Sequence, residues 1–190
     1  MNAHHPSHAD HTDHEGQSQE PRFATLMAEA TVGSERFGHR EHVYLTWLAV
    51  RRHGVTAAVG LISDGIQRTA RYAGAPQKYH ATVSRAWVEA VGYHVADDAI
   101  SSRAANEDFA AFADRHPALL DKRLLSSHYR STTLASAEAR TAWVEPDLAP
   151  FPWQARQEAA RLSGTDGAGA EHDAGGPEHQ RGEAEGQRDG

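Results

Sequence analysis

Residues 39–54 read HREHVYLTWLAVRRHG, and this stretch decides the class of fold. The last turn of the helix that it predicts over 39–53 is RRH, and Gly54 follows directly. Cations suit the negative end of the helix dipole, and glycine accepts the left-handed conformation in which many helices end. The stretch therefore predicts a helix that stops at Gly54.

Similar signals predict helices on both sides of this stretch. Over 56–73, Val59, Ile62 and Ile66 mark a buried stripe at spacings of three and four residues, and Gly74 ends the helix. Further helices are predicted over residues 23–32, 78–95, 107–115, 119–130 and 134–143. No stretch has the alternating β-branched pattern of a strand. The expected fold class is all-α, a compact bundle of about five to six helices.

Composition divides the 190 residues into three segments. Residues 1–22 are rich in histidine and nearly free of apolar residues, and residues 154–190 are rich in Gly, Glu and Asp. The first segment cannot bury enough apolar surface to offset the entropy cost of folding, and the composition of the second is that of a flexible tail. We therefore expect a disordered His-rich tail, a helical domain over 23–153, and a mostly disordered acidic tail.

Charge and composition exclude several classes of protein. The formal net charge of −7 lies in the two tails, so the domain between them has no basic face that would favour nucleic acid. The chain has no cysteine, and no apolar run reaches the roughly 18 residues of a membrane span. We expect a cytoplasmic protein that binds neither nucleic acid nor membrane.

Three histidines are the best candidates for chemistry. His39 and His42 are three residues apart on one predicted helix, which places their Cβ atoms roughly 5–6 Å apart. His80 lies in the first turn of another helix and is the candidate third ligand. Three protein ligands and one open position describe a catalytic site for a divalent transition metal, Zn, Fe or Cu. In the alternative, His39 and His42 are surface residues and His80 is a satisfied core histidine.

Two tyrosines are candidates for proton transfer or for orienting a substrate. Tyr79 directly precedes His80, and Tyr129 lies in the polar segment SSHYRS. A phenol beside a metal can hold or donate a proton. The alternative for Tyr79 is that it simply packs against its neighbours.

Four blocks of this sequence resemble an uncharacterised bacterial family of small all-helical proteins with HREH and KYHxT motifs. The blocks are FGHREHVYLTWLAVRRHG, GAPQKYHATV, HPALLDKRLLSSHYRSTTLASAEAR and AWVEPDL, and together they span residues 37–148. The resemblance implies that the three histidines occupy motif positions, but it implies no particular activity. The chain departs from the pattern at Ala81, where many relatives have an acidic residue, and at His128, where an aromatic residue is commoner.

These observations favour a metal-dependent enzyme that acts on a small-molecule substrate. The metal would lower the pKa of a bound water or act as a Lewis acid. HExxH, GxGxxG, GxxxxGK[ST] and GxSxG are all absent, so zincin, nucleotide-binding and serine-hydrolase chemistry have no support. Two alternatives are a non-catalytic metal-handling or sensing protein that uses the His-rich tail, and a metal-free helical interaction module.

Overall fold

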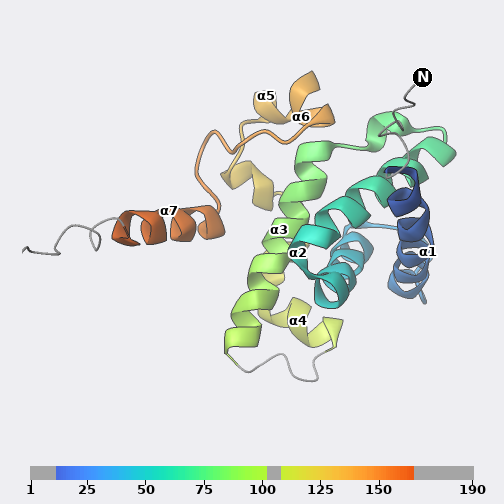
Figure 1. Cartoon of the computed structure of the whole chain (residues 1–190), viewed down its shortest axis with the longest axis horizontal. Helices are drawn as coiled ribbons and strands as arrows, with labels where there is room; N and C mark the ends of the chain where they lie inside the picture. Colours follow the sequence, from blue (N-terminus) through green and yellow to red (C-terminus); the bar gives the residue numbers. More distant parts are fainter. Residues whose placement is uncertain (1–11, 102–107, 165–190) are drawn as a thin grey trace, which may run out of the picture. The chain divides into compact units, whose positions relative to one another are not determined.

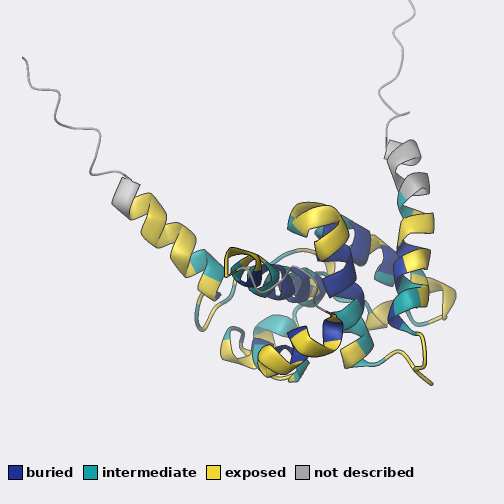
Figure 2. Ribbon diagram, turned by 90° about the horizontal axis from the view of Figure 1, so that it is seen from below, coloured by how far each residue is buried: buried dark blue, intermediate teal, exposed yellow. Residues whose placement is uncertain are grey.

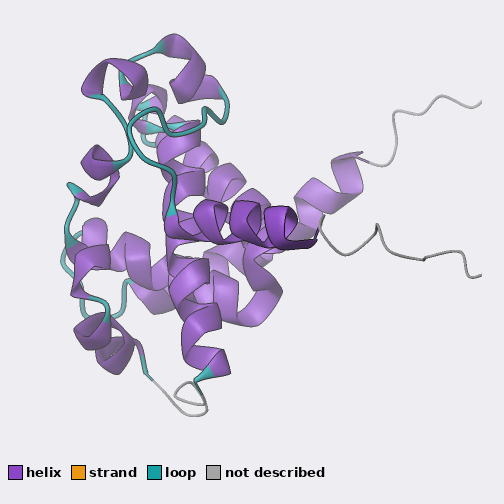
Figure 3. Ribbon diagram, turned by 90° about the vertical axis from the view of Figure 1, so that its left-hand side faces the viewer, coloured by secondary structure: helices purple, strands orange, loops and turns teal. Residues whose placement is uncertain are grey.

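The computed structural model describes residues 12–101 and 108–164. These residues form helices joined by loops and contain no strand, as Figure 3 shows, so the prediction of an all-α fold is confirmed. The chain divides into two units, residues 1–153 and residues 154–190. The described part of the second unit belongs to one helix, α7 (Pro152–Gly164).

Two long helices form the centre of the first unit, α2 (His39–Tyr72) and α3 (Ala81–Ile100) (Figure 1). Gly54 interrupts α2 with a φ of 77° and a ψ of 163°, a conformation that favours glycine. The predicted break at Gly54 is therefore confirmed, although the chain resumes a helix at once.

The second part of α2 lies directly against α3 because Gly92 of α3 has no side chain. A Cβ atom on Gly92 would lie 2.4 Å from a methyl carbon of Val55, so the two backbones approach more closely than larger residues would permit. Leu45 and Ile62 of α2 and Val88 of α3 are fully buried in one hydrophobic core. Figure 2 shows the buried residues concentrated where these helices meet.

α1 (Thr12–Ala30) packs on the second part of α2 through Phe23, Leu26 and Ala30, which are buried. The predicted helix over 23–32 is therefore present, but it begins earlier, at Thr12. The polar residues before Phe23 lack an apolar stripe, so the sequence pattern did not reveal them as part of a helix. Residues 1–11 of the predicted N-terminal tail lie outside the described residues.

The segment after α3 is less regular than predicted. The prediction of two continuous helices over 119–130 and 134–143 is wrong. The structure has several short helices there, with loops between them. In order, the elements are α4 (Phe109–Arg115), the 3₁₀-helices η2 (Pro117–Leu120) and η3 (Leu124–Ser127), α5 (Ser131–Leu134) and α6 (Ala137–Thr141). The Ser136 side chain accepts a hydrogen bond from the Ala139 amide and so begins a new helix within the predicted one. After α6 the chain forms no helix up to α7, as its prolines predict, but it bends over residues 147–149 rather than staying extended.

α7 was not predicted, because its residues were assigned to the acidic tail. Residues 165–190 of that tail lie outside the described residues. Within the described parts of the chain, no helix is both long enough and apolar enough to cross a membrane.

Candidate functional site

His39 begins α2, and its ring joins this helix to the segment after α4. Its Nε2 donates a hydrogen bond to the carbonyl oxygen of Leu119 at 3.0 Å. The ring also packs edge-on against Trp87, with ring centroids 4.6 Å apart. Burial lowers the pKa of His39, although the hydrogen bond to Leu119 opposes that shift. His39 is therefore a neutral side chain at pH 7 that connects three parts of the fold.

His42 lies one turn further along α2, and its ring nitrogen Nε2 is not satisfied. This nitrogen is buried and has no hydrogen-bond partner in the described structure. Burial, with a smaller effect from the neighbouring His39, lowers the pKa of His42 to about 4. The ring is therefore neutral at pH 7. A neutral imidazole with an open nitrogen can accept a hydrogen bond or bind a transition metal.

His80 is the N-cap residue of α3, and both of its ring nitrogens are occupied. Nδ1 accepts a hydrogen bond from the Val83 amide at 3.3 Å. Nε2 donates to the carbonyl oxygen of Leu134 at 2.8 Å. These two bonds set one tautomer and leave no lone pair free for another ligand.

The structure does not bring the three histidines together as metal ligands. Among the residues that it describes, no group of three or more His, Cys, Asp or Glu side chains is placed to hold a metal ion. The His39 ring contacts Trp87, which lies roughly 10 Å beyond His80 along α3. A divalent metal at His39, His42 and His80 stays a prediction.

The two tyrosines occupy different environments. Tyr129 is almost fully buried, and its hydroxyl donates to the carbonyl oxygen of Val144 at 2.8 Å. Burial raises the pKa of the Tyr129 hydroxyl, so it keeps its proton at neutral pH. Tyr79 is half-buried and lines a surface hollow of about 450 Å³ together with Gln67 and Arg140. A role for either tyrosine in proton transfer stays a prediction.

His128, which departs from the family pattern, also bonds to the backbone. Its Nδ1 donates to the carbonyl oxygen of Ala149 at 3.0 Å, and its ring packs against Phe151 with centroids 4.3 Å apart. The side chain therefore holds the extended segment that follows α6.

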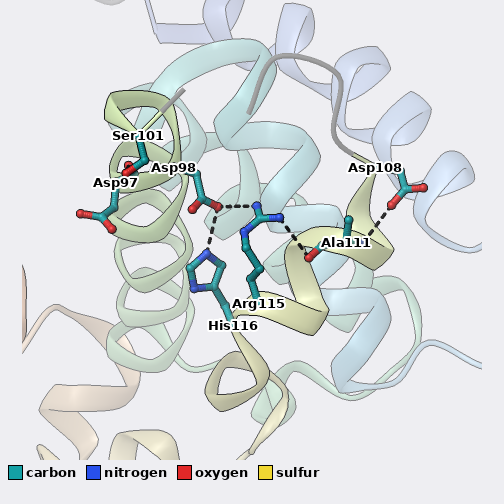
Figure 4. Close-up of polar contacts among 7 residues, drawn as sticks. All are labelled: Asp97, Asp98, Ser101, Asp108, Ala111, Arg115 and His116. Atoms are coloured by element: carbon teal, nitrogen blue, oxygen red, sulfur yellow. Dashed lines mark hydrogen bonds and ion pairs between the residues drawn. The ribbon is translucent and has the colours of Figure 1, made fainter. Parts of the chain in front are cut away.

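A polar cluster that sequence analysis did not single out joins α3 to the end of α4 (Figure 4). Asp98 is 3% exposed, and its Oδ2 accepts hydrogen bonds from Arg115 Nη2 at 2.8 Å and from His116 Nε2 at 2.9 Å. The ring of His116 packs against that of His94, with centroids 4.4 Å apart. A carboxylate, a guanidinium and two imidazoles therefore meet at this joint.

The cluster stabilises the charged form of its carboxylate. Burial alone would raise the pKa of Asp98, but the hydrogen bonds from Arg115 and His116 outweigh burial and lower it. Burial and the adjacent His116 lower the pKa of His94. Asp98 can orient His116 for proton transfer, and it also holds α4 against α3.

One sequence signal could have revealed this cluster. His94 and Asp98 are four residues apart, so they share one face of a helix. The helix predicted over 78–95 ended before Asp98, whereas α3 continues to Ile100. The boundary error therefore concealed the pair.

A groove of about 400 Å³ lies between α1 and the second part of α2. Its lining is mainly apolar, with Phe23 and Met27 from α1 and Gly65 and Tyr72 from α2. The ring of Phe23 lies over Gly65, where a Cβ atom would be only 2.0 Å from it. Tyr72 is 83% exposed at the rim, so the groove presents an aromatic ring to solvent.

Four polar residues complete the lining of this groove: Glu20, Thr31, Arg68 and Thr69. The Nη2 atom of Arg68 is buried and has no hydrogen-bond partner in the described part of the chain. A buried donor left unsatisfied costs free energy, more so when it belongs to a charged group. The groove therefore combines an apolar surface with one unsatisfied cationic donor.

Comparisons with known proteins found no matching family model, no similar curated protein and no similar solved structure. The resemblance to a bacterial family with HREH and KYHxT motifs stays a prediction.

Proposed function

We propose that this protein is a helical binding module that holds a small amphipathic molecule in the groove between α1 and α2. The observation that supports the proposal is the groove itself. Its volume of about 400 Å³ lies within the range of small-molecule sites, and its lining is mainly apolar with few polar groups. A metal-free helical interaction module was one alternative prediction from the sequence. That prediction named no ligand, and the present proposal adds one.

The size of the groove favours a small molecule over a peptide helix. A bound helix inserts several anchor residues along an extended groove, at spacings of three, four and seven residues. Phe23 and Gly65 both line this groove, and the Phe23 ring fills the space beside Gly65. The open space that remains suits one short chain or ring.

The test uses 1-octanol, a neutral amphipathic probe, and isothermal titration calorimetry on the full chain. Ala28→Trp places a large ring in the groove at an exposed α1 position, and it should abolish octanol binding. Ala57→Trp is the matched control, because Ala57 is an exposed alanine of α2 that does not line the groove. Absence of octanol binding by the parent, or equal binding by both variants, would reject the proposal.

A metal-dependent enzyme is the second candidate function, and one observation favours it. The buried Nε2 of His42 has no hydrogen-bond partner in the described structure, and its low pKa keeps the nitrogen unprotonated. An unprotonated imidazole nitrogen is the form that binds Zn²⁺, Fe²⁺ or Cu²⁺. A small-molecule substrate would then occupy the open position on the metal.

Metal content tests this second candidate. The full chain, His42→Ala and the control His53→Ala are purified without an added tag and compared by mass spectrometry. His53 is an exposed residue of α2, and all three proteins share the same N-terminal histidines. Loss of about one equivalent of metal in His42→Ala alone would support the metal-dependent enzyme. Equal metal content in all three would remove His42 from any metal site.

A further inference from the structure

We infer that the molecule bound between α1 and α2 carries a carboxylate, and that Arg68 binds this group. The inference rests on the proposed function, because it names the chemical class of the ligand in the same groove. Its basis is the unsatisfied Nη2 of Arg68, the engagement of the two threonine hydroxyls in the lining, and the balance of charge there.

Arg68 lies one turn after Gly65 on α2, so it is near the contact of Gly65 with Phe23 of α1. Its Nη2 is buried without a hydrogen-bond partner in the structure as described. A guanidinium stays charged at any physiological pH, so it cannot avoid the cost of burial by losing its proton. The planar nitrogens of arginine match the two oxygens of a carboxylate.

The two threonine hydroxyls of the lining already have acceptors. The Thr31 hydroxyl donates to the carbonyl oxygen of Met27 at 2.8 Å. The Thr69 hydroxyl donates to the carbonyl oxygen of Gly65 at 2.9 Å. A polar ligand group that enters the groove therefore meets Arg68 as its cationic donor, and the apolar part of the ligand meets Phe23 and Met27.

The charges around the groove favour a single negative charge on the ligand. The lining contains one cation, Arg68, and one carboxylate, the exposed Glu20. A phosphate dianion would meet repulsion from Glu20 with no second cation in the lining to offset it. A carboxylate is neutralised by Arg68 alone, so we commit to a carboxylate with a hydrocarbon tail.

The experiment compares octanoate with 1-octanol on the full chain by isothermal titration calorimetry at neutral pH. The two probes share a hydrocarbon tail and differ in the head group. Octanoate should bind at least about tenfold more tightly than octanol, as expected for a charge-assisted hydrogen bond. Arg68→Met should remove that preference, so that the variant binds octanoate and octanol with equal affinity. Arg71→Met is the control, because Arg71 is an exposed arginine of the same helix outside the groove, and it should keep the preference.

The outcomes separate this inference from the proposed function. Equal affinity of the parent for both probes, or a preference that survives in Arg68→Met, would overturn the carboxylate assignment and leave the groove as an apolar site. If neither octanoate nor octanol binds to the parent, both proposals are overturned. Circular dichroism checks the fold of each variant, and Arg68→Gln repeats the test with a neutral polar side chain if the methionine variant does not fold.

Discussion

His42 shows how one half-buried side chain makes the stability of the protein depend on pH. Its ring is neutral in the folded protein because burial disfavours the charged form. In the unfolded chain the same ring is hydrated and has the ordinary pKa of 6.5. Over the interval between these two values, acid favours the unfolded chain.

We predict that His42→Phe makes the protein less sensitive to acid. As the pH falls from 6.5 to about 4, the unfolded chain binds a proton at His42 that the folded protein does not bind. This difference removes up to about 3 kcal/mol of stability from the parent over that window. Phenylalanine cannot titrate, so the variant should keep most of this stability.

Urea unfolding at pH 7 and pH 4.5 measures this effect. The control is His53→Phe, because His53 is exposed on α2. The prediction is wrong if the parent, His42→Phe and His53→Phe lose the same free energy of unfolding between the two pH values.

At the scale of elements, the close contact between α1 and α2 depends on the absence of a side chain at Gly65. The ring of Phe23 occupies the space that a Cβ atom would need. Gly60, on the same helix, has open space at the corresponding position. The two glycines therefore allow a matched comparison.

We predict that Gly65→Ala destabilises the protein and that Gly60→Ala stabilises it. The first variant forces Phe23 to move and should cost about 1–3 kcal/mol through overpacking. The second improves the helix and should gain about 0.5–1 kcal/mol. Thermal unfolding followed by circular dichroism measures both changes. A gain in both variants would show that α1 is not held at Gly65.

The joint between α3 and α4 depends on the ion pair around Asp98. We predict that Asp98→Ala destabilises the protein by about 3 kcal/mol, because it removes the acceptor of His116 Nε2 and one of the acceptors of Arg115. Asp114→Ala, at an exposed position of α4, should change stability by less than about 0.5 kcal/mol. Denaturant unfolding of the two variants tests the prediction, and equal midpoints would contradict it.

At the scale of the whole molecule, the irregular segment that follows α4 is held on the helical centre by side chains from α3. The Thr82 hydroxyl, which is fully buried, donates to the carbonyl oxygen of Ala142 at 2.7 Å and accepts from the Val144 amide at 3.1 Å. His80 holds the carbonyl oxygen of Leu134 nearby in the chain. These backbone groups of the irregular segment have no partner within a regular helix. Side chains at the start of α3 form hydrogen bonds with them instead.

We predict that Thr82→Val loosens this whole segment. Valine keeps the shape of threonine but leaves the Ala142 carbonyl and the Val144 amide without a partner, which should cost about 1–3 kcal/mol. Hydrogen exchange should accelerate over residues 134–148. Thr56→Val is the control, because Thr56 is exposed on α2. Unchanged exchange in Thr82→Val would show that the segment is held by other contacts.

Local signals along the chain predicted the helical class and its central break. Gly54 interrupts α2 where the RRHG pattern predicts, and the prolines before α7 lie in a segment without a helix. These features depend on residues within about one helical turn of each other, so they can be read from sequence. Helix ends were less predictable, as α1 and α3 show, because packing rather than composition extends a helix past its local signals.

The partners of the candidate residues were decided by tertiary structure alone. His39 and His42 share a helical face, as their spacing predicts, but the partner of His39 is the carbonyl of Leu119, 80 residues away. The acceptor for His80 lies 54 residues away, and the groove at Arg68 exists only because α1 packs against α2. The sequence by itself determined an all-helical chain with a break at Gly54. Tertiary packing determined which side chains meet, because contacts between distant residues depend on how helices fit together rather than on spacing along one helix.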